Sequence, residues 1–289
     1  MKIRLAVLAL SLIPAVGSGQ TRTDDPADSF APDWPFEVGE ESAYDVTFGP
    51  IRVGRAHLRI EALDTVRATP AYRLAFELEG GPVFYKIDDR TVSWLAVEPY
   101  RSLRLEQILR EGGYRRHRRY ELDQARETYT REDWDEEAGA YRSHRRQRDL
   151  AMPAEALDEI SYLFLIRTLP LEVGRIYRFD RYFEPEGNPV VVEVLRRERV
   201  RVRAGTFQTV VVRPVVQTEG LFGEGGEAEV YITDDDRRLI VQLKTSMKVG
   251  TLNMYLRDYD PGGGAGGSAS AARPSAEPAE TLPPSADPR

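Results

Sequence analysis

The feature that most constrains the fold is an alternation of apolar and polar residues with a period of two. Segment 71–79 (AYRLAFELE) is one example, and its large apolar side chains fall on one side of an extended chain: Tyr72, Leu74, Phe76 and Leu78. Segments 190–194, 206–216 and 239–247 repeat the pattern. Because successive side chains of a strand point to opposite faces, this period predicts antiparallel strands with one buried and one wet face.

The alternation changes phase once, within segment 51–60 (IRVGRAHLRI). The apolar positions lie on one side up to Val53 and on the other side from Ala56 onward. A slip of one residue turns every side chain to the other face, so an inserted residue must restore the register. We therefore predict a β-bulge at Gly54, since glycine tolerates the positive φ that such a kink often needs. Bulges suit a strongly curved sheet or an open β-barrel.

One stretch departs from period two. Segment 153–168 (PAEALDEISYLFLIRT) has a proline at a plausible first helical position, acidic residues toward its beginning and a basic residue near its end. This arrangement matches the dipole of a helix. Because residues 162–166 are apolar on all sides, we expect a buried helix inserted centrally into the sheet. The predicted fold class is thus mainly β, with one inserted α-helix.

The two ends of the chain differ in composition from its centre. Residues 1–19 have a basic start, an apolar run too short to span a bilayer and small residues at the end, which is typical of a secretory signal peptide. Residues 20–35 are expected to form a flexible lead-in, 36–259 a single β-rich domain and 260–289 a disordered Gly/Ala/Pro/Ser-rich tail. We therefore expect a periplasmic or secreted protein without a transmembrane segment after cleavage.

Composition limits the chemistry. The chain contains no cysteine, which excludes disulfides, thiolate metal ligands and cysteine nucleophiles. The formal net charge is −7, although residues 101–150 carry thirteen arginines against eleven acidic residues. Because the two signs are interleaved, this segment indicates cross-strand ion pairs and not the one-signed field that binds nucleic acid. We expect no nucleic-acid partner.

The run Asp234–Asp236, followed by two arginines, is the strongest candidate for a metal site. A calcium loop places its ligands at alternating positions and includes a glycine at the bend, and this run has neither feature. Aspartate is favoured in turns because its side chain accepts hydrogen bonds from nearby backbone N–H groups. We interpret the run as a tight turn between two strands and expect no metal and no cofactor.

No catalytic set can be assigned. The three histidines lie in strand-like or Arg-rich segments: His57, His117 and His144. The sequence has no G-x-S-x-G elbow, no H-E-x-x-H pair and no phosphate-binding loop followed by a helix. Chance pairs of carboxylates are unavoidable in so acidic a chain, and the least implausible members are Asp88, Asp89 and Asp158, the last of which also suits a helix cap.

Several short motifs occur in a characteristic order: 36–40 (FEVGE), 53–56 (VGRA), 158–161 (DEIS), 202–207 (VRAGTF) and 231–234 (YITD). In this order they resemble the family called domain of unknown function 3108, over about residues 36–257. The resemblance implies an exported bacterial protein rich in antiparallel sheet. It implies no activity and gives no residue a role. Tyr231 stands where the family pattern often has tryptophan.

Aromatic residues supply the remaining site candidates. Tyr85, Trp94 and Tyr162 fall in segments expected to line the concave side of the sheet, and Arg167 is a candidate anion anchor at the rim. Packing of the core is the alternative explanation for the aromatic residues. Our leading hypothesis is a non-enzymatic envelope protein that binds an amphipathic or saccharide-containing ligand, such as a lipid or glycan.

Two alternatives remain at this point: a structural or assembly factor that binds another envelope protein, and a carboxylate-dependent glycan hydrolase. Structure separates the three. A ligand binder needs a cavity of at least about 300 Å³. An assembly factor should have a filled interior and an exposed apolar patch or bare strand edge. A hydrolase should place two carboxyl groups about 5–10 Å apart in a cleft.

Overall fold

The computed structural model describes residues 37–81, 86–216, 227–247 and 250–263. The predicted signal peptide, the lead-in and most of the predicted tail lie outside this part. The strands are β1 (Glu41–Phe48), β2 (Ile51–Val66), β3 (Thr69–Gly80), β4 (Ile87–Ala96), β5 (Ser102–Glu111), β6 (Tyr114–Asp123), β7 (Thr128–Asp135), β8 (Ala140–Arg142), β9 (Leu150–Ala151), β10 (Ile176–Phe179), β11 (Val190–Val202), β12 (Gly205–Val215), β13 (Glu227–Thr233), β14 (Ile240–Met247) and β15 (Gly250–Asp260). The helices are α1 (Glu159–Thr168) and the short 3₁₀ segments η2 (Arg145–Gln147) and η3 (Pro185–Gly187).

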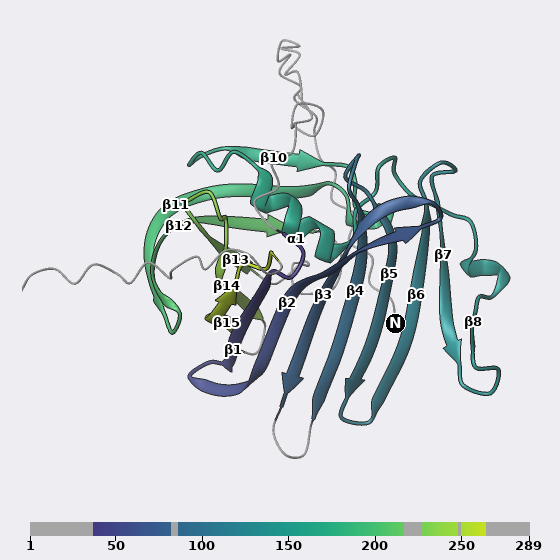
Figure 1. The fold of residues 1–289 in the computed structure, drawn as a ribbon, viewed down its shortest axis with the longest axis horizontal. Coiled ribbons are helices and arrows are strands. Elements are labelled where there is room, and N and C mark those ends of the chain that lie inside the picture. The colour runs from purple at the N-terminus through teal and green to yellow at the C-terminus, as the bar shows by residue number, and fades with distance from the viewer. Residues whose placement is uncertain (1–36, 82–85, 217–226, 248–249, 264–289) are drawn as a thin grey trace, which may run out of the picture. The chain divides into compact units, whose positions relative to one another are not determined.

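All fifteen strands belong to one open, antiparallel sheet, in the order β10-β11-β12-β13-β14-β15-β1-β2-β3-β4-β5-β6-β7-β8, with β9 paired to β7. The first and last long strands, β1 and β15, are therefore neighbours near the middle of the sheet. The sheet bends so that β10–β12 lie across from the top of β2–β5, with α1 between them (Figure 1). The mainly β fold with one inserted helix is confirmed.

The predicted bulge is present. Val46 of β1 pairs with Gly54, and the next residue pairs with Arg52, so Val53 is the extra residue of β2. The reason for a glycine differs from the expectation, because Gly54 does not have a positive φ. A Cβ at this position would lie 2.3 Å from the carbonyl oxygen of Glu79 and 3.1 Å from the Cα of Gly80. Glycine is required here for close backbone approach between β2 and β3.

The helix begins later than predicted, at Glu159 and not near Pro153. Asp158 is its N-cap, and the carboxylate accepts hydrogen bonds from the backbone N–H groups of Ile160 (3.0 Å) and Ser161 (2.9 Å). The preceding residues use their backbone donors elsewhere, since Ala156 N donates to Gln124 Oε1 and Leu157 N donates to Arg181 O. These bonds to the segments after β6 and β10 replace the hydrogen bonds that a longer helix would need.

The core lies between α1 and the sheet. Eight consecutive residues of the helix, 160–167, are buried, as the apolar run predicts. The face of β1–β7 that points toward α1 carries large apolar side chains, among them Tyr44, Leu58, Leu74, Leu95 and Leu105. We call the opposite face of these strands the outer face. No helix in the described part of the chain is long and apolar enough to cross a membrane.

Candidate functional site

The concave side of the sheet is filled and not hollow. A crevice beside α1 is lined mainly by apolar side chains of the helix and of the β11–β12 region, and Glu159 and Tyr182 complete its lining. Its volume is about 10 Å³, which is close to the minimum that holds one water molecule. This crevice is therefore far smaller than the cavity that we expected for a buried ligand.

The structure does not bring the predicted ligand-binding residues together. Tyr162 is buried on α1 and lines the crevice. Arg167 is also buried, and its guanidinium donates to both carboxylate oxygens of Glu40, at 2.7 and 3.1 Å. It also donates to the carbonyl oxygens of Arg237 (3.2 Å) and Arg238 (2.9 Å). Arg167 thus joins the end of α1 to the start of β1, and it does not lie at an open rim. Tyr85 lies outside the described residues.

Trp94 lies on the outer face, contrary to the prediction that it lines the concave side. Its neighbour Ser93 points toward α1 and donates to Asp158 Oδ2 at 2.6 Å. Because alternate residues of a strand face opposite ways, the Trp94 ring is directed outward. There its Nε1 donates to Asp64 at 3.0 Å, and the Arg104 guanidinium lies 5.3 Å from the ring centre.

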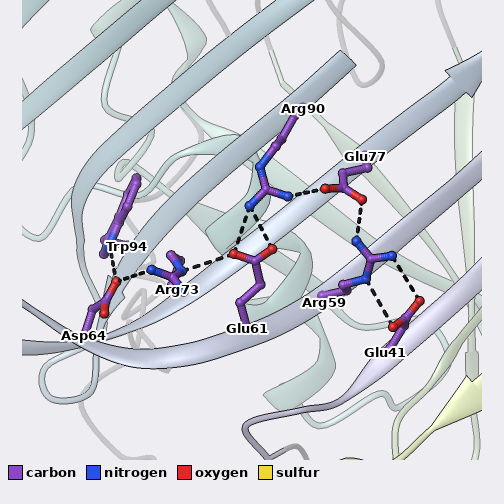
Figure 2. Close-up of polar contacts among 8 residues, drawn as sticks. All are labelled: Glu41, Arg59, Glu61, Asp64, Arg73, Glu77, Arg90 and Trp94. Atoms are coloured by element: carbon purple, nitrogen blue, oxygen red, sulfur yellow. Dashed lines mark hydrogen bonds and ion pairs between the residues drawn. The ribbon is translucent and has the colours of Figure 1, made fainter. Parts of the chain in front are cut away.

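The outer face carries a ladder of alternating charges that ends at Trp94 (Figure 2). Its members come from β1 to β4: Glu41, Arg59, Glu77, Arg90, Glu61, Arg73 and Asp64. Ion pairs continue across β5–β7, for example between Arg118 and Asp133 at 2.7 Å and between Arg119 and Glu132 at 2.7 Å. The cross-strand ion pairs expected from the interleaved sequence are confirmed. Each acid of the ladder is held by an arginine, so the ladder stabilises the sheet.

The three carboxylates considered for hydrolysis have separate roles. Asp158 is completely buried and bound to Ser93 and the helix N-terminus. Asp88 pairs with Arg110 at 3.2 Å. Asp89 accepts a hydrogen bond from the backbone N–H of Arg110 at 2.8 Å, and burial raises its pKa to about 6. A buried cap has no access to substrate, so Asp158 cannot form half of a hydrolytic pair.

Sequence reasoning overlooked Glu159, the first residue of α1. It lines the crevice and accepts a hydrogen bond from Gln107 Nε2 at 2.8 Å. Burial, followed by the nearby charge of Asp158, raises the pKa of Glu159 to about 7. Perturbed carboxyls often mark functional sites. Here the adjacent space is too small for a substrate, so the group affects stability and not binding.

The aspartate run is a turn, as predicted. Thr233 Oγ1 donates to Asp235 Oδ1 at 2.6 Å, and the backbone N–H of Arg237 donates to the same oxygen at 3.2 Å. Asp234 forms an ion pair with Arg197 at 2.8 Å. Among the residues that the structure describes, no group of three or more His, Asp or Glu side chains could hold a metal ion.

The histidines of β2 and β6 are held by acids. His57 Nδ1 lies 2.7 Å from Glu41 Oε1, and His117 Nε2 lies 2.9 Å from Glu106 Oε1. The His117 ring also stacks on Trp134, with 5.3 Å between ring centres. These contacts place both rings in the charged outer face, which agrees with the interpretation of surface strand residues.

A larger hollow lies where the start of β2 meets the end of β3, and sequence reasoning missed it. Its volume is about 540 Å³, and its lining residues are Arg52, Gly54, Arg55, Glu79, Gly80, Gly81 and Lys86. The floor is backbone, because a Cβ on Gly80 would lie 2.2 Å from the carbonyl oxygen of Val53. The glycines that face each other across β2 and β3 are the sequence signal that could have indicated this site.

The charge of this hollow, which we call the basic hollow, is mainly positive. Arg52 forms an ion pair with Asp45 at 2.7 Å. Arg55 and Lys86 are exposed and make no ion pair or side-chain hydrogen bond with the described residues. Two apolar side chains at the neighbouring turn are also exposed, Phe48 by 39% and Ile51 by 65%. Free cations over a backbone floor can bind an anion.

Comparisons with known proteins identify a family but no activity. A beta-barrel-like protein of the domain of unknown function DUF1849 from Brucella abortus is similar at 9% identity with a TM-score of 0.49, over 78% of this chain and 98% of that one. The hypothetical protein CT021 from Chlamydia trachomatis is similar at 7% identity with a TM-score of 0.35, over 78% of this chain and 88% of that one. No curated protein matches the chain. Residues 43–257 match the family of proteins of unknown function DUF3108, and the chain therefore belongs to that family.

Proposed function

We propose that this chain is an exported, non-enzymatic binding protein that holds the phosphate-bearing head of an acidic amphiphile in the basic hollow. The observation that carries the proposal is a hollow of about 540 Å³ with a glycine floor and two cations, Arg55 and Lys86, that form no ion pair with any described residue. Export is supported by the signal-like residues 1–19.

The chemistry of the hollow suits a phosphate group. A guanidinium presents parallel N–H donors that match two phosphate oxygens, and an ammonium adds a compact positive charge. Glycines at positions 54, 80 and 81 let a ligand approach the backbone closely. Asp45 already pairs with Arg52, and Glu79 lies opposite Arg55 in the β2–β3 register, so the three cations of the hollow exceed these two acids by one positive charge.

The apolar neighbours explain why the proposed ligand is an amphiphile and not a free anion. Phe48 and Ile51 flank the turn between β1 and β2, next to Arg52 in the sequence. Exposed apolar side chains beside a charged hollow are typical of a surface that contacts lipid or a partner. The acyl part of the ligand would lie against these two side chains while its head occupies the hollow.

Two features favour this site over the concave side of the sheet, where the sequence predicted the ligand. The concave side is occupied by α1, and its crevice holds about 10 Å³. The acids that could have supported hydrolysis are capped or paired, as with Asp158 and Asp88. We retain the predicted class of ligand but propose a different site, at the start of β2 and the end of β3 and not on the concave side.

The test is calorimetric titration of the full-length protein with a short-chain phosphatidic acid kept below its micelle concentration. We expect binding, no binding of the matching phosphatidylcholine and weaker binding of inorganic phosphate. The variant Arg55→Gln/Lys86→Gln should bind at least about tenfold more weakly, since each charged hydrogen bond contributes about 1.5–3 kcal/mol. The matched control Arg145→Gln/Arg146→Gln, in η2, removes the same charge from exposed positions elsewhere.

Equal affinity for the acidic and zwitterionic lipids would refute the proposal. So would wild-type affinity in the Arg55→Gln/Lys86→Gln variant. If inorganic phosphate bound as tightly as the lipid, the site would be an anion site without the proposed contribution from Phe48 and Ile51.

A further inference from the structure

A row of arginines runs along the β11–β12 hairpin. Positions 197, 199, 201 and 203 are all arginine and all exposed, and they alternate with side chains that are partly or fully buried. Because alternate residues of a strand lie about 6.7 Å apart on one side, Arg197 and Arg201 are about 13 Å apart. The row is therefore longer than a single phosphate group.

Most of the charge at the tip of this hairpin is not neutralised. Arg197, the arginine of the row that is farthest from the tip, pairs with Asp234 at 2.8 Å. Arg199 and Arg201 make no ion pair or side-chain hydrogen bond with any described residue. Arg203 lies 4.0 Å from Asp45, at the outer limit of an ion pair.

The tip of the hairpin reaches the basic hollow. Ala204 N donates to the carbonyl oxygen of Leu256 in β15 at 3.1 Å, so the tip folds back over the neighbour of β1. Asp45 of β1 then contacts Arg203 from the hairpin and Arg52 from the hollow. In Figure 1 the β11–β12 tip and the β1–β2 turn lie at the same end of the sheet.

The hairpin tip and the hollow meet at Asp45, and we call their basic residues together the basic surface: Arg52, Arg55, Lys86, Arg199, Arg201 and Arg203. The acids among them are Asp45 and Glu79. The surface is thus strongly positive on a chain whose formal net charge is −7. A patch of positive charge on a chain with a negative net charge indicates a negatively charged partner.

We propose that this basic surface docks the protein onto an anionic lipid bilayer. The arginine row would lie on the headgroups, while Phe48 and Ile51 at the adjacent turn reach the boundary of the acyl chains. A bilayer fits better than a soluble polyanion, because stable peripheral binding combines basic residues with exposed apolar side chains and this surface has both. The inference rests on the proposed function, since it identifies the membrane as the source of the acidic amphiphile.

The test is co-sedimentation of the full-length protein with vesicles of phosphatidylcholine, with and without phosphatidylglycerol. We expect binding only to the acidic vesicles, and we expect it to weaken as salt is added. The variant Arg199→Gln/Arg201→Gln should lower the partition coefficient about tenfold or more. It should leave affinity for the soluble short-chain lipid nearly unchanged, because neither residue lines the basic hollow.

Controls separate the two proposals. Arg145→Gln/Arg146→Gln should sediment like the wild type, and thermal melting should show that every variant is folded. If Arg199→Gln/Arg201→Gln bound vesicles like the wild type, docking through the row would be wrong while the basic hollow could still bind its lipid. If the wild type bound vesicles through the row but not the short-chain lipid, the proposed hollow would be wrong. Tighter binding to a soluble acidic polysaccharide than to vesicles would overturn the membrane as partner.

Discussion

Replacing Glu40 by leucine tests how α1 is attached to the sheet. The side chains of Arg167 and Glu40 are only 1% and 5% exposed, and their closest approach is 2.7 Å. Leucine would remove the carboxylate that pairs with the buried guanidinium, which would keep its bonds to the carbonyl oxygens of Arg237 and Arg238. Removal of one partner of a buried pair costs about 3–5 kcal/mol, because the remaining charge has lost its compensation. This loss is a large part of a typical stability of about 5–15 kcal/mol.

The double variant Glu40→Leu/Arg167→Met gives the sharper result. Both charges are then absent, so the remaining cost comes from the carbonyl oxygens of Arg237 and Arg238, which lose their donors. Unsatisfied buried groups cost about 1–3 kcal/mol. We therefore expect the double variant to be no less stable than Glu40→Leu alone, and the two single losses to be far from additive.

Urea unfolding followed by far-ultraviolet circular dichroism measures all four proteins of this cycle. The free energy of unfolding in water should fall by about 3–5 kcal/mol for each single variant. Additive losses within about 0.5 kcal/mol would show that the two side chains do not interact in solution. A loss below about 1 kcal/mol for Glu40→Leu would show that Arg167 reaches water, which contradicts its burial.

Three further predictions concern single positions. Asp158→Ala should cost about 2–4 kcal/mol in urea unfolding, because it removes a helix cap and the carboxylate to which the buried Ser93 hydroxyl donates, whereas Asp158→Asn should cost less. Gly54→Ala should lower stability by about 1–3 kcal/mol, because its Cβ would meet backbone atoms, whereas Gly113→Ala meets nothing within 4 Å and should change little. Because its pKa is raised to about 7, the Glu159 carboxyl of the folded state keeps its proton at pH values where the unfolded state, with a pKa of 4.5, has released it. Wild-type stability relative to Glu159→Gln should therefore be highest below pH 4.5 and fall as the pH rises to about 7, and equal pH profiles would contradict this.

Local patterns in the sequence determined much of the fold. The period of two predicts the strands, the change of phase at Gly54 locates the bulge between β1 and β2, and the apolar run 162–166 predicts a buried helix. The turn at Asp234–Asp236 follows from the hydrogen-bonding habits of aspartate. All of these features depend on residues close together in the chain, so their causes can be read without knowing the tertiary structure.

Tertiary structure alone decided the features that depend on distant partners. Period two defines two faces of β4 but not which of them is inside. Ser93 faces inward, where its hydroxyl donates a hydrogen bond to Asp158, and Trp94 consequently faces outward. Arg167 forms its ion pair with Glu40, which is 127 positions away in the sequence. The basic surface likewise combines residues at the starts of β2 and β4 with residues near the tip of the β11–β12 hairpin. Its concentrated charge exists only because the folded sheet brings segments that are distant in the sequence to one end.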